Sequence, residues 1–136
     1  MTCVLRAGGE AFDVDAFLAE SPFEVEAIFR RGEPRLKHRP DGPKCTRSGF
    51  NVATSESDIG DLKGQVEGAI QFLERHSTEL RRLMAFEGVE GAELNFAVFR
   101  REVPDQTHKF PSELLLRAGV LGLDIALSHY HVSEDD

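Results

Sequence analysis

A short segment of the chain, residues 30–47, concentrates positive charge that can bind an anion. It holds seven lysine and arginine residues against two acidic ones, so its net charge is +5 while the whole chain of 136 residues carries -8. Prolines and glycines recur through the segment and predict a long loop. The side chains expected to contact a partner are Arg35, Lys37, Arg39, Lys44 and Arg47.

A cationic loop can hold a phosphate, RNA or the acidic surface of another protein. Nucleic acid is the weakest of these partners, because the whole chain is acidic and the segment has no aromatic side chain to stack on a base. The same acidity argues against attraction to an anionic membrane. The simplest interpretation is a solvated loop that offsets an acidic remainder. Among binding functions, an acidic protein partner is favoured.

Two histidines near the C-terminus, His129 and His131, are separated by one residue in a predicted strand. Residues two apart on a strand share a face, so both imidazoles can reach one metal ion. A third ligand has to come from elsewhere, for example from His108 or His76, and no ligand spacing identifies it. The alternative is a histidine pair where a strand leaves the core, and no cofactor is predicted.

Cys45 lies in the basic segment beside Lys44 and Arg47, whose charges favour a thiolate. A catalytic thiol also needs a general base and an oxyanion site. His38 is the one candidate base in the segment, and no further pattern completes a catalytic centre. The sequence therefore leans towards a protein that is not an enzyme.

The elements that must position these residues are organised around a long amphipathic helix predicted over residues 58–86. Its apolar side chains recur at three- and four-residue steps, so they form one stripe that tertiary structure must cover. Asp58 is expected to cap the start of the helix, and Gly88 follows its end. The positions of the stripe are Ile59, Leu62, Val66, Ala69, Ile70, Leu73, Ser77, Leu80 and Met84.

Two glycines lie one turn apart on the other side of this predicted helix. Gly64 and Gly68 permit another backbone to approach closely, and Phe72 lies near the same edge. The three residues are therefore a candidate seam for a homodimer or another partner. The alternative is a first half of the helix that propagates poorly, since each glycine costs about 1 kcal/mol relative to alanine.

Alternation of apolar and polar residues predicts five strands, at residues 2–7, 23–31, 49–54, 92–101 and 123–132. Capping residues and prolines predict short helices at 12–20 and 112–118. Within the second strand, Phe23, Val25, Ala27 and Phe29 are expected to share one face.

This order of elements, β-α-β-β-α-β-α-β, predicts an α+β two-layer sandwich. We expect a mostly antiparallel sheet of about five strands, covered by one long and two short helices. The first six elements have the ferredoxin-like split pattern. A doubly wound parallel sheet is disfavoured, because its strands would be apolar on both faces.

Length and composition set the remaining expectations. One domain is expected over residues 1–132, followed by a disordered acidic tail at 133–136. The two cysteines, Cys3 and Cys45, have no framework spacing, which fits free thiols in a reducing compartment, with a single disulfide bridge as the alternative. The N-terminus lacks the features of a signal peptide, and no apolar stretch approaches the roughly 20 residues that cross a bilayer. We therefore expect a cytoplasmic protein.

Four stretches of the chain resemble a bacterial family of small α+β domains of unknown function. They are Phe12-Asp13-Val14-Asp15 ahead of Ser21-Pro22, Arg31-Gly32-Glu33-Pro34, Ser48-Gly49-Phe50-Asn51-Val52, and Phe110-Pro111-Ser112-Glu113-Leu114-Leu115 with Leu121-Gly122-Leu123-Asp124-Ile125. The chain differs in its long basic loop at 32–48, and in carrying Phe50 where relatives often have tryptophan. Some relatives are similar to toxin-immunity proteins, so the resemblance implies binding rather than catalysis. It assigns no functional residue.

Three functional hypotheses follow from these patterns. The first is a small binding module that engages a protein partner through the basic loop, for instance an immunity-type protein that blocks a toxin. The second is a metal-dependent module or enzyme that uses the C-terminal histidines. The third is a homodimeric structural protein joined through the glycine seam.

Overall fold

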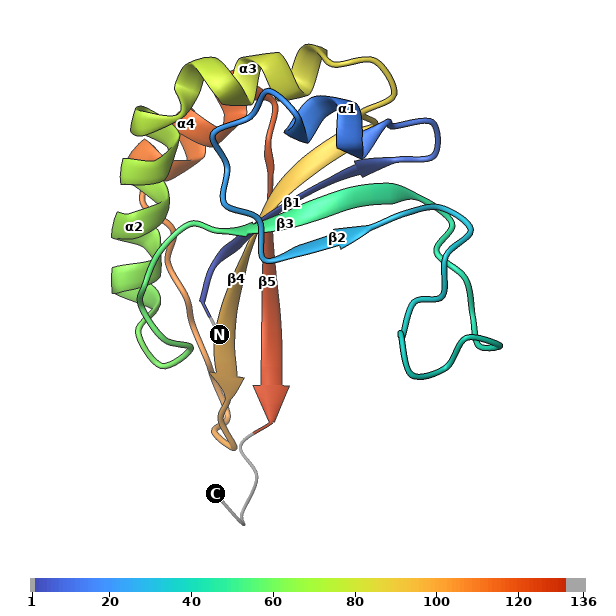
Figure 1. Ribbon diagram of the computed structural model, residues 1–136. Coiled ribbons are helices and arrows are strands. Elements are labelled where there is room, and N and C mark those ends of the chain that lie inside the picture. The colour runs from blue at the N-terminus through green and yellow to red at the C-terminus, as the bar shows by residue number, and fades with distance from the viewer. Residues whose placement is uncertain (1, 132–136) are drawn as a thin grey trace.

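The computed structural model describes residues 2–131 of the chain (Figure 1). Within them lie a five-stranded sheet and four helices. The strands are β1 Val4–Gly9, β2 Ala27–Phe29, β3 Ser48–Ala53, β4 Gly91–Arg100 and β5 Asp124–His131. The helices are α1 Val14–Leu18, α2 Leu62–Arg75, α3 Ser77–Ala85 and α4 Ser112–Leu121.

The sheet is mixed, with the strand order β2-β3-β1-β4-β5. Strand β1 lies at its centre and pairs antiparallel with both β3 and β4, and β2 pairs antiparallel with β3. Only β5, which follows the crossover helix α4, is parallel to its neighbour β4. The predicted α+β class and the number of strands are therefore confirmed.

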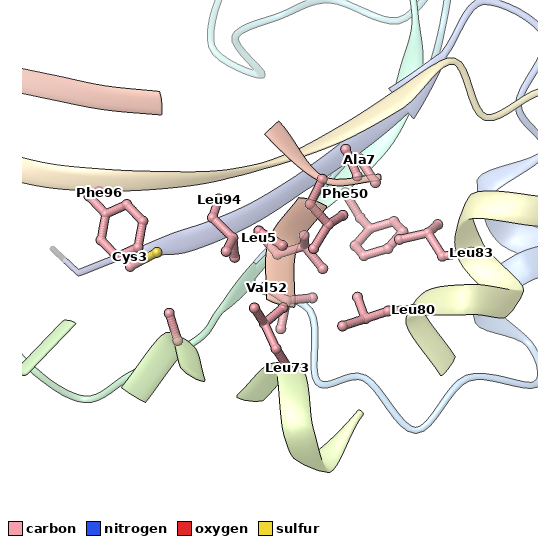
Figure 2. Packing of buried hydrophobic residues seen from close by; sticks show 14 of the residues in the cluster. Cys3, Leu5, Ala7, Phe50, Val52, Leu73, Leu80, Leu83, Leu94 and Phe96 are labelled. Carbon is pink, nitrogen blue, oxygen red and sulfur yellow. The ribbon is translucent and has the colours of Figure 1, made fainter. Parts of the chain in front are cut away.

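The helices cover one face of the sheet and leave the other face uncovered (Figure 1). Strand alternation explains the division, because successive side chains point to opposite faces. Leu5 and Leu94 are fully buried under the helices, whereas their neighbours Arg6 and Glu93 lie on the uncovered face. Figure 2 shows Leu73 of α2 and Leu80 of α3 directed at this buried side of the sheet.

An aromatic cluster fills the end of the core beneath α1 and α3. Phe17 of α1 is fully buried and stacks on Phe50 of β3, with ring centroids 5.7 Å apart. Phe86 meets the Phe17 ring edge-on at 5.3 Å. The guanidinium of Arg82 lies over the same ring, 4.0 Å from its centroid. Stacked and edge-on aromatic contacts and a cation over a ring each add to the energy of burial.

A buried glutamine completes the sheet where β1 begins. The register that pairs Val4 with Asn95 would place residue 2 opposite Ala97, but β1 does not extend that far. The Gln65 side chain of α2 takes this place: Ala97 N donates to its Oε1 at 3.0 Å, and its Nε2 donates to Ala97 O at 2.9 Å. Gln65 is fully buried, and the side-chain amide thus replaces a backbone partner.

The prediction of one continuous helix over residues 58–86 is wrong. The segment forms two helices, α2 and α3, which meet at His76, and Asp61 rather than Asp58 caps the first by accepting from Gly64 N at 2.9 Å. A straight helix of that length would extend about 43 Å, longer than the strands it has to cover. The bend at His76 instead brings Leu80 and Leu83 over the sheet, where both are fully buried.

The predicted strand at 23–31 is also largely wrong, because only Ala27–Phe29 pairs with β3. Phe23 and Val25 pack against the core, as the alternation suggested. Ala27 and Phe29, however, lie opposite Asn51 and Gly49 and so belong to the uncovered face. The prediction fails because regular strand pairing begins only at Ala27. Phe23 and Val25 lie before the strand, so their alternation does not continue into its faces.

Phe29 has a specific place on the uncovered face. A Cβ added to Gly49 would come within 2.5 Å of the Phe29 ring and 2.0 Å of the Ala7 carbonyl oxygen. A side chain at residue 49 would therefore collide with this ring and with the backbone of β1, so the position requires glycine.

His76 gives the fold a predicted dependence on pH. Burial, helped by the charge of Arg75 and opposed by that of Glu79, lowers the pKa of His76 below its ordinary value of 6.5. The unfolded chain therefore binds a proton more readily than the folded one, and stability decreases as pH falls through about 6.5. Urea unfolding at a series of pH values should show this loss in wild type and a weaker one in His76→Gln. His38→Gln, in the exposed basic segment, is the control. Equal pH profiles for wild type and His76→Gln would contradict the assignment.

No helix within residues 2–131 is both long enough and apolar enough to cross a membrane. The predicted acidic tail at 133–136 lies outside the described residues.

Candidate functional site

The basic segment is a long loop, as predicted, and backbone hydrogen bonds join its two sides. Residues 30–47, named here the basic arm, project from the ends of β2 and β3 (Figure 1). The hydrogen bonds run from Arg35 N to Pro43 O at 2.9 Å and from Cys45 N to Glu33 O at 2.8 Å. An isolated bridge pairs Pro34 with Lys44 between them. The arm therefore presents its charges from a defined backbone.

Ion pairs hold the base of the basic arm to the body of the protein. The Arg30 guanidinium contacts the Asp15 carboxylate of α1 through two hydrogen bonds, at 2.8 and 3.0 Å. This contact lowers the pKa of Asp15 and raises that of Arg30. On the other side, Arg47 Nε lies 3.3 Å from Glu90 Oε2, and its Nη2 donates to Gly8 O. Two arginines thus serve to attach the arm.

The five predicted partner-binding residues divide into two groups. Arg47 belongs to the base, and the Lys44 ammonium donates to the backbone carbonyl of Pro40 within the arm. By contrast, Arg35, Lys37 and Arg39 are exposed and form no side-chain hydrogen bond or ion pair with any residue from 2 to 131. We call these three residues the tip cations. They are the part of the predicted set that remains available to a partner.

The hypothesis of a catalytic cysteine requires a general base beside Cys45. Cys45 is partly buried in the arm, and His38 is exposed at its tip. No hydrogen bond joins the two side chains in the described part of the chain. The other cysteine, Cys3, is fully buried in the core, where burial, opposed by a hydrogen bond with Thr54, raises the pKa of its thiol to about 12.

We expect only one of the two thiols to react in the folded protein. Ellman's reagent at about pH 8 should label Cys45 quickly, because thiolates are the reactive species and Cys3 holds its proton well above that pH. The second equivalent should appear only in denaturant. Cys45→Ser should remove the fast phase, and Cys3→Ser should retain it. Fast reaction of two thiols in folded wild type would show that the β1 end of the core is open.

The C-terminal histidines come together only in part. The ring centroids of His108 and His129 lie 5.8 Å apart. His131 follows on the same face of β5, yet no group of three potential ligands forms a metal site within residues 2–131. His108 Nε2 is buried and has no hydrogen-bond partner among those residues. Of the predicted ligands, the structure thus brings His108 and His129 close together but does not group His131 with them, and metal binding stays a prediction.

The glycine seam faces the protein's own chain. A Cβ on Gly68 would come within 2.3 Å of Ser55 Cβ, and one on Gly64 would come equally close to Ser57 Oγ. Phe72 packs against the core and stacks on Phe23, with centroids 5.6 Å apart. The close approach that the glycines allow is thus used by the segment that connects β3 to α2. Dimerisation through this seam stays a prediction.

The uncovered face of the sheet carries polar residues that the sequence did not single out. Arg6, Asn51, Asn95 and Tyr130 line a hollow of about 420 Å³ on this face. They come from four different strands, and their side chains meet only because β1 lies between β3 and β4. In the sequence each of them is a polar residue that alternates with apolar ones. Their grouping becomes visible only when the order of the strands is known.

Comparisons with known proteins do not assign this arrangement. No protein-family model, no curated protein and no solved structure matches the chain.

Proposed function

We propose that the protein is a non-enzymatic binding module that engages an acidic protein surface through its basic arm. The observation that carries the proposal is that three tip cations have no partner within residues 2–131 of a chain whose net charge is -8. In a chain so rich in carboxylates, intramolecular partners are plentiful. Positive side chains held away from them are available to carboxylates on another molecule.

The conformation of the arm and its attachment to the body support this proposal. Its two sides are joined by backbone hydrogen bonds, and its base is attached through Arg30 and Arg47. A preformed surface loses less conformational entropy on binding than a flexible loop does. Two of the three tip cations are arginines, whose planar guanidinium groups bind carboxylates through two parallel hydrogen bonds. Charge complementarity of this kind accelerates association and makes it sensitive to salt.

A protein partner fits these features better than nucleic acid does. The arm has no phenylalanine, tyrosine or tryptophan, the side chains on which bases usually stack. The body that surrounds it is strongly acidic and would repel a long polyanion, whereas a protein can present a small acidic patch to the arm alone. An immunity-type protein that blocks a toxin is one function of this class. The resemblance to the bacterial family of unknown function favours it.

We also infer that the first four strands form a ferredoxin-like core, to which α4 and β5 are added. The antiparallel order β2-β3-β1-β4 supports this inference. A core of this kind positions the arm at one end of the sheet, beyond the ends of β2 and β3, and away from the helical layer.

A capture experiment with charge-matched variants tests the function. The tagged full-length protein is used to isolate partners from a lysate of the native host at about 50 mM salt, where surface charges are weakly screened. The first variant carries Arg35→Ala, Lys37→Ala and Arg39→Ala. The control carries Lys63→Ala, Arg75→Ala and Arg81→Ala, which remove the same charge from exposed positions on α2 and α3.

We expect wild type and the helix control to capture the same protein, and the arm variant to lose it by at least about tenfold, since each charge-assisted contact is worth about 1.5–3 kcal/mol. Capture should also weaken as salt is raised. Capture that is equal for all three proteins, or that the control loses as strongly as the arm variant does, would show that the arm is not the interface.

A further inference from the structure

The uncovered face of the sheet holds a row of side chains that cross all five strands. The register places Ala27, Asn51, Arg6, Glu93 and Asp124 next to one another in that order. Arg6 lies at the centre of this row, on the central strand. It is exposed and has no ion pair or hydrogen bond with any residue from 2 to 131, although Glu93 is its neighbour on β4. An arginine so placed is available to an anionic group from outside.

Arg6 borders the hollow of about 420 Å³, which lies within the size range of small-molecule sites, about 300–1,000 Å³. Its floor contains the small side chains Val4 and Ala97. Asn51 and Asn95 add amide groups to its lining, and Tyr130 stands at one side. Cationic, amide and aromatic groups from separate strands thus converge on one concavity.

Two of the amide groups in this lining are incompletely paired. Asn51 Oδ1 is buried and has no hydrogen-bond partner in the described part of the chain. Asn95 is only 8% exposed, and its Oδ1 accepts from Ser128 Oγ at 2.8 Å, which orients its Nδ2 donors. Those donors make no hydrogen bond with the described residues. A buried acceptor and an oriented donor without partners are the polar groups that a ligand satisfies.

The remaining charge in the hollow is negative. Glu26, Glu56 and Asp58 line it, and the backbone N–H of Glu26 donates to Asn51 O at 2.8 Å, which holds this residue beside Asn51. A simple anion would be attracted by Arg6 and repelled by the three carboxylates of Glu26, Glu56 and Asp58. A simple cation would meet the opposite pattern. The lining therefore suits a molecule that carries both charges and has an N–H to donate.

We propose that this hollow binds a small zwitterion of the α-amino acid class. The ligand's carboxylate pairs with the Arg6 guanidinium and accepts from Asn95 Nδ2. Its ammonium group donates to Asn51 Oδ1 and lies near the Glu26 carboxylate. The N–H donor that Asn51 requires distinguishes an amino acid from a zwitterion with a quaternary nitrogen. This site is separate from the basic arm and does not depend on the proposed function.

Chemical-shift mapping of the full-length ¹⁵N-labelled protein tests the proposal. The probe is an equimolar mixture of the twenty common L-amino acids, followed by its members one at a time up to about 10 mM, since a Kd of 1 mM corresponds to only about −4.1 kcal/mol. We expect saturable shifts at the backbone amides of Arg6, Asn51 and Asn95 for at least one amino acid. Its N-acetyl derivative, its amide and glycine betaine each lack one required group and should bind at least about tenfold more weakly.

Two variants link any binding to the lining. Arg6→Gln and Asn51→Leu should each weaken binding at least about tenfold, while Arg101→Gln, an exposed arginine outside the hollow, should bind as wild type does. Unchanged thermal unfolding of Arg6→Gln would exclude loss of fold as the cause. The proposal is overturned if no amino acid gives saturable shifts, if glycine betaine binds equally well, or if a folded Arg6→Gln protein binds with wild-type affinity.

Discussion

Replacement of Gln65 by leucine is expected to lower the free energy of unfolding by about 3 kcal/mol. The change removes both hydrogen bonds to Ala97 and leaves its N–H and C=O buried without partners. A buried backbone group without a partner costs about 1–3 kcal/mol, and leucine recovers part of that loss because it is apolar and of similar size. The third bond, from Gln65 Nε2 to Asp58 O, is lost as well. Urea unfolding of both proteins gives the difference directly.

Gln71→Leu is the matched control, since Gln71 lies on the same helix but is exposed. Its effect should stay within about 0.5 kcal/mol. Hydrogen exchange adds a local readout: the Ala97 amide should lose protection in Gln65→Leu more than the neighbouring β4 amides do. Equal stability of Gln65→Leu and Gln71→Leu would mean that the side-chain amide does not replace a strand partner at this place.

Truncation of Phe17 to alanine is expected to be the most damaging single change, with a loss of about 3–5 kcal/mol in the free energy of unfolding. The fully buried ring joins α1 to Phe50 of β3 and to Phe86 after α3. It also supports the guanidinium of Arg82, which donates to the Phe17 carbonyl at 2.8 Å. Its loss leaves a cavity where three elements meet, and that cavity cannot close without moving α1.

Phe99→Ala is the control for this prediction, because Phe99 is 38% exposed on the uncovered face. It should cost less than about 1 kcal/mol. The truncation at Phe17 should also weaken attachment of the basic arm, since Asp15 on α1 holds Arg30. Thermal unfolding measures the first effect, and hydrogen exchange at the base of the arm measures the second. Similar losses for the two truncations would contradict the central place given to Phe17.

The sequence predicted the class of the fold because its strands alternate. Leu94, Phe96 and Val98 of β4 are buried as the pattern required. The long helix was predicted wrongly for a physical reason. Periodicity reports which side chains face inwards, and it continues across His76, but it does not report how far a straight helix can follow a sheet. The buried Gln65 could not be foreseen either, because its partner is a backbone group 32 residues away.

For a similar reason, the sequence predicted the basic arm but not the hollow. The basic arm is local in sequence, so its charge was visible before any fold was known. Which of its cations are attached and which are available depends on distant partners such as Asp15 and Glu90. The hollow on the uncovered face was not predicted at all. Arg6 and Asn51 are 45 positions apart in the sequence and become neighbours only through the pairing of β1 with β3.

The basic arm and the hollow depend on different parts of the fold. The basic arm joins the sheet at the end of β2 and the start of β3, where two exposed ion pairs link it to α1 and to Glu90. The hollow needs an uncovered sheet face, which follows from placing every described helix on the other side (Figure 1).

Site-specific photo-crosslinking tests the central claim, that the basic arm is the surface in contact with an acidic partner. A benzophenone amino acid is placed at Leu36, which is 49% exposed in the arm, and in a second protein at Leu116, which is 68% exposed on α4. After capture at low salt, irradiation should join the partner to the protein labelled at position 36 and not to the one labelled at 116. The crosslink should disappear when the tip cations are changed to alanine. Crosslinking from position 116 alone, or from position 36 regardless of the tip cations, would contradict the account.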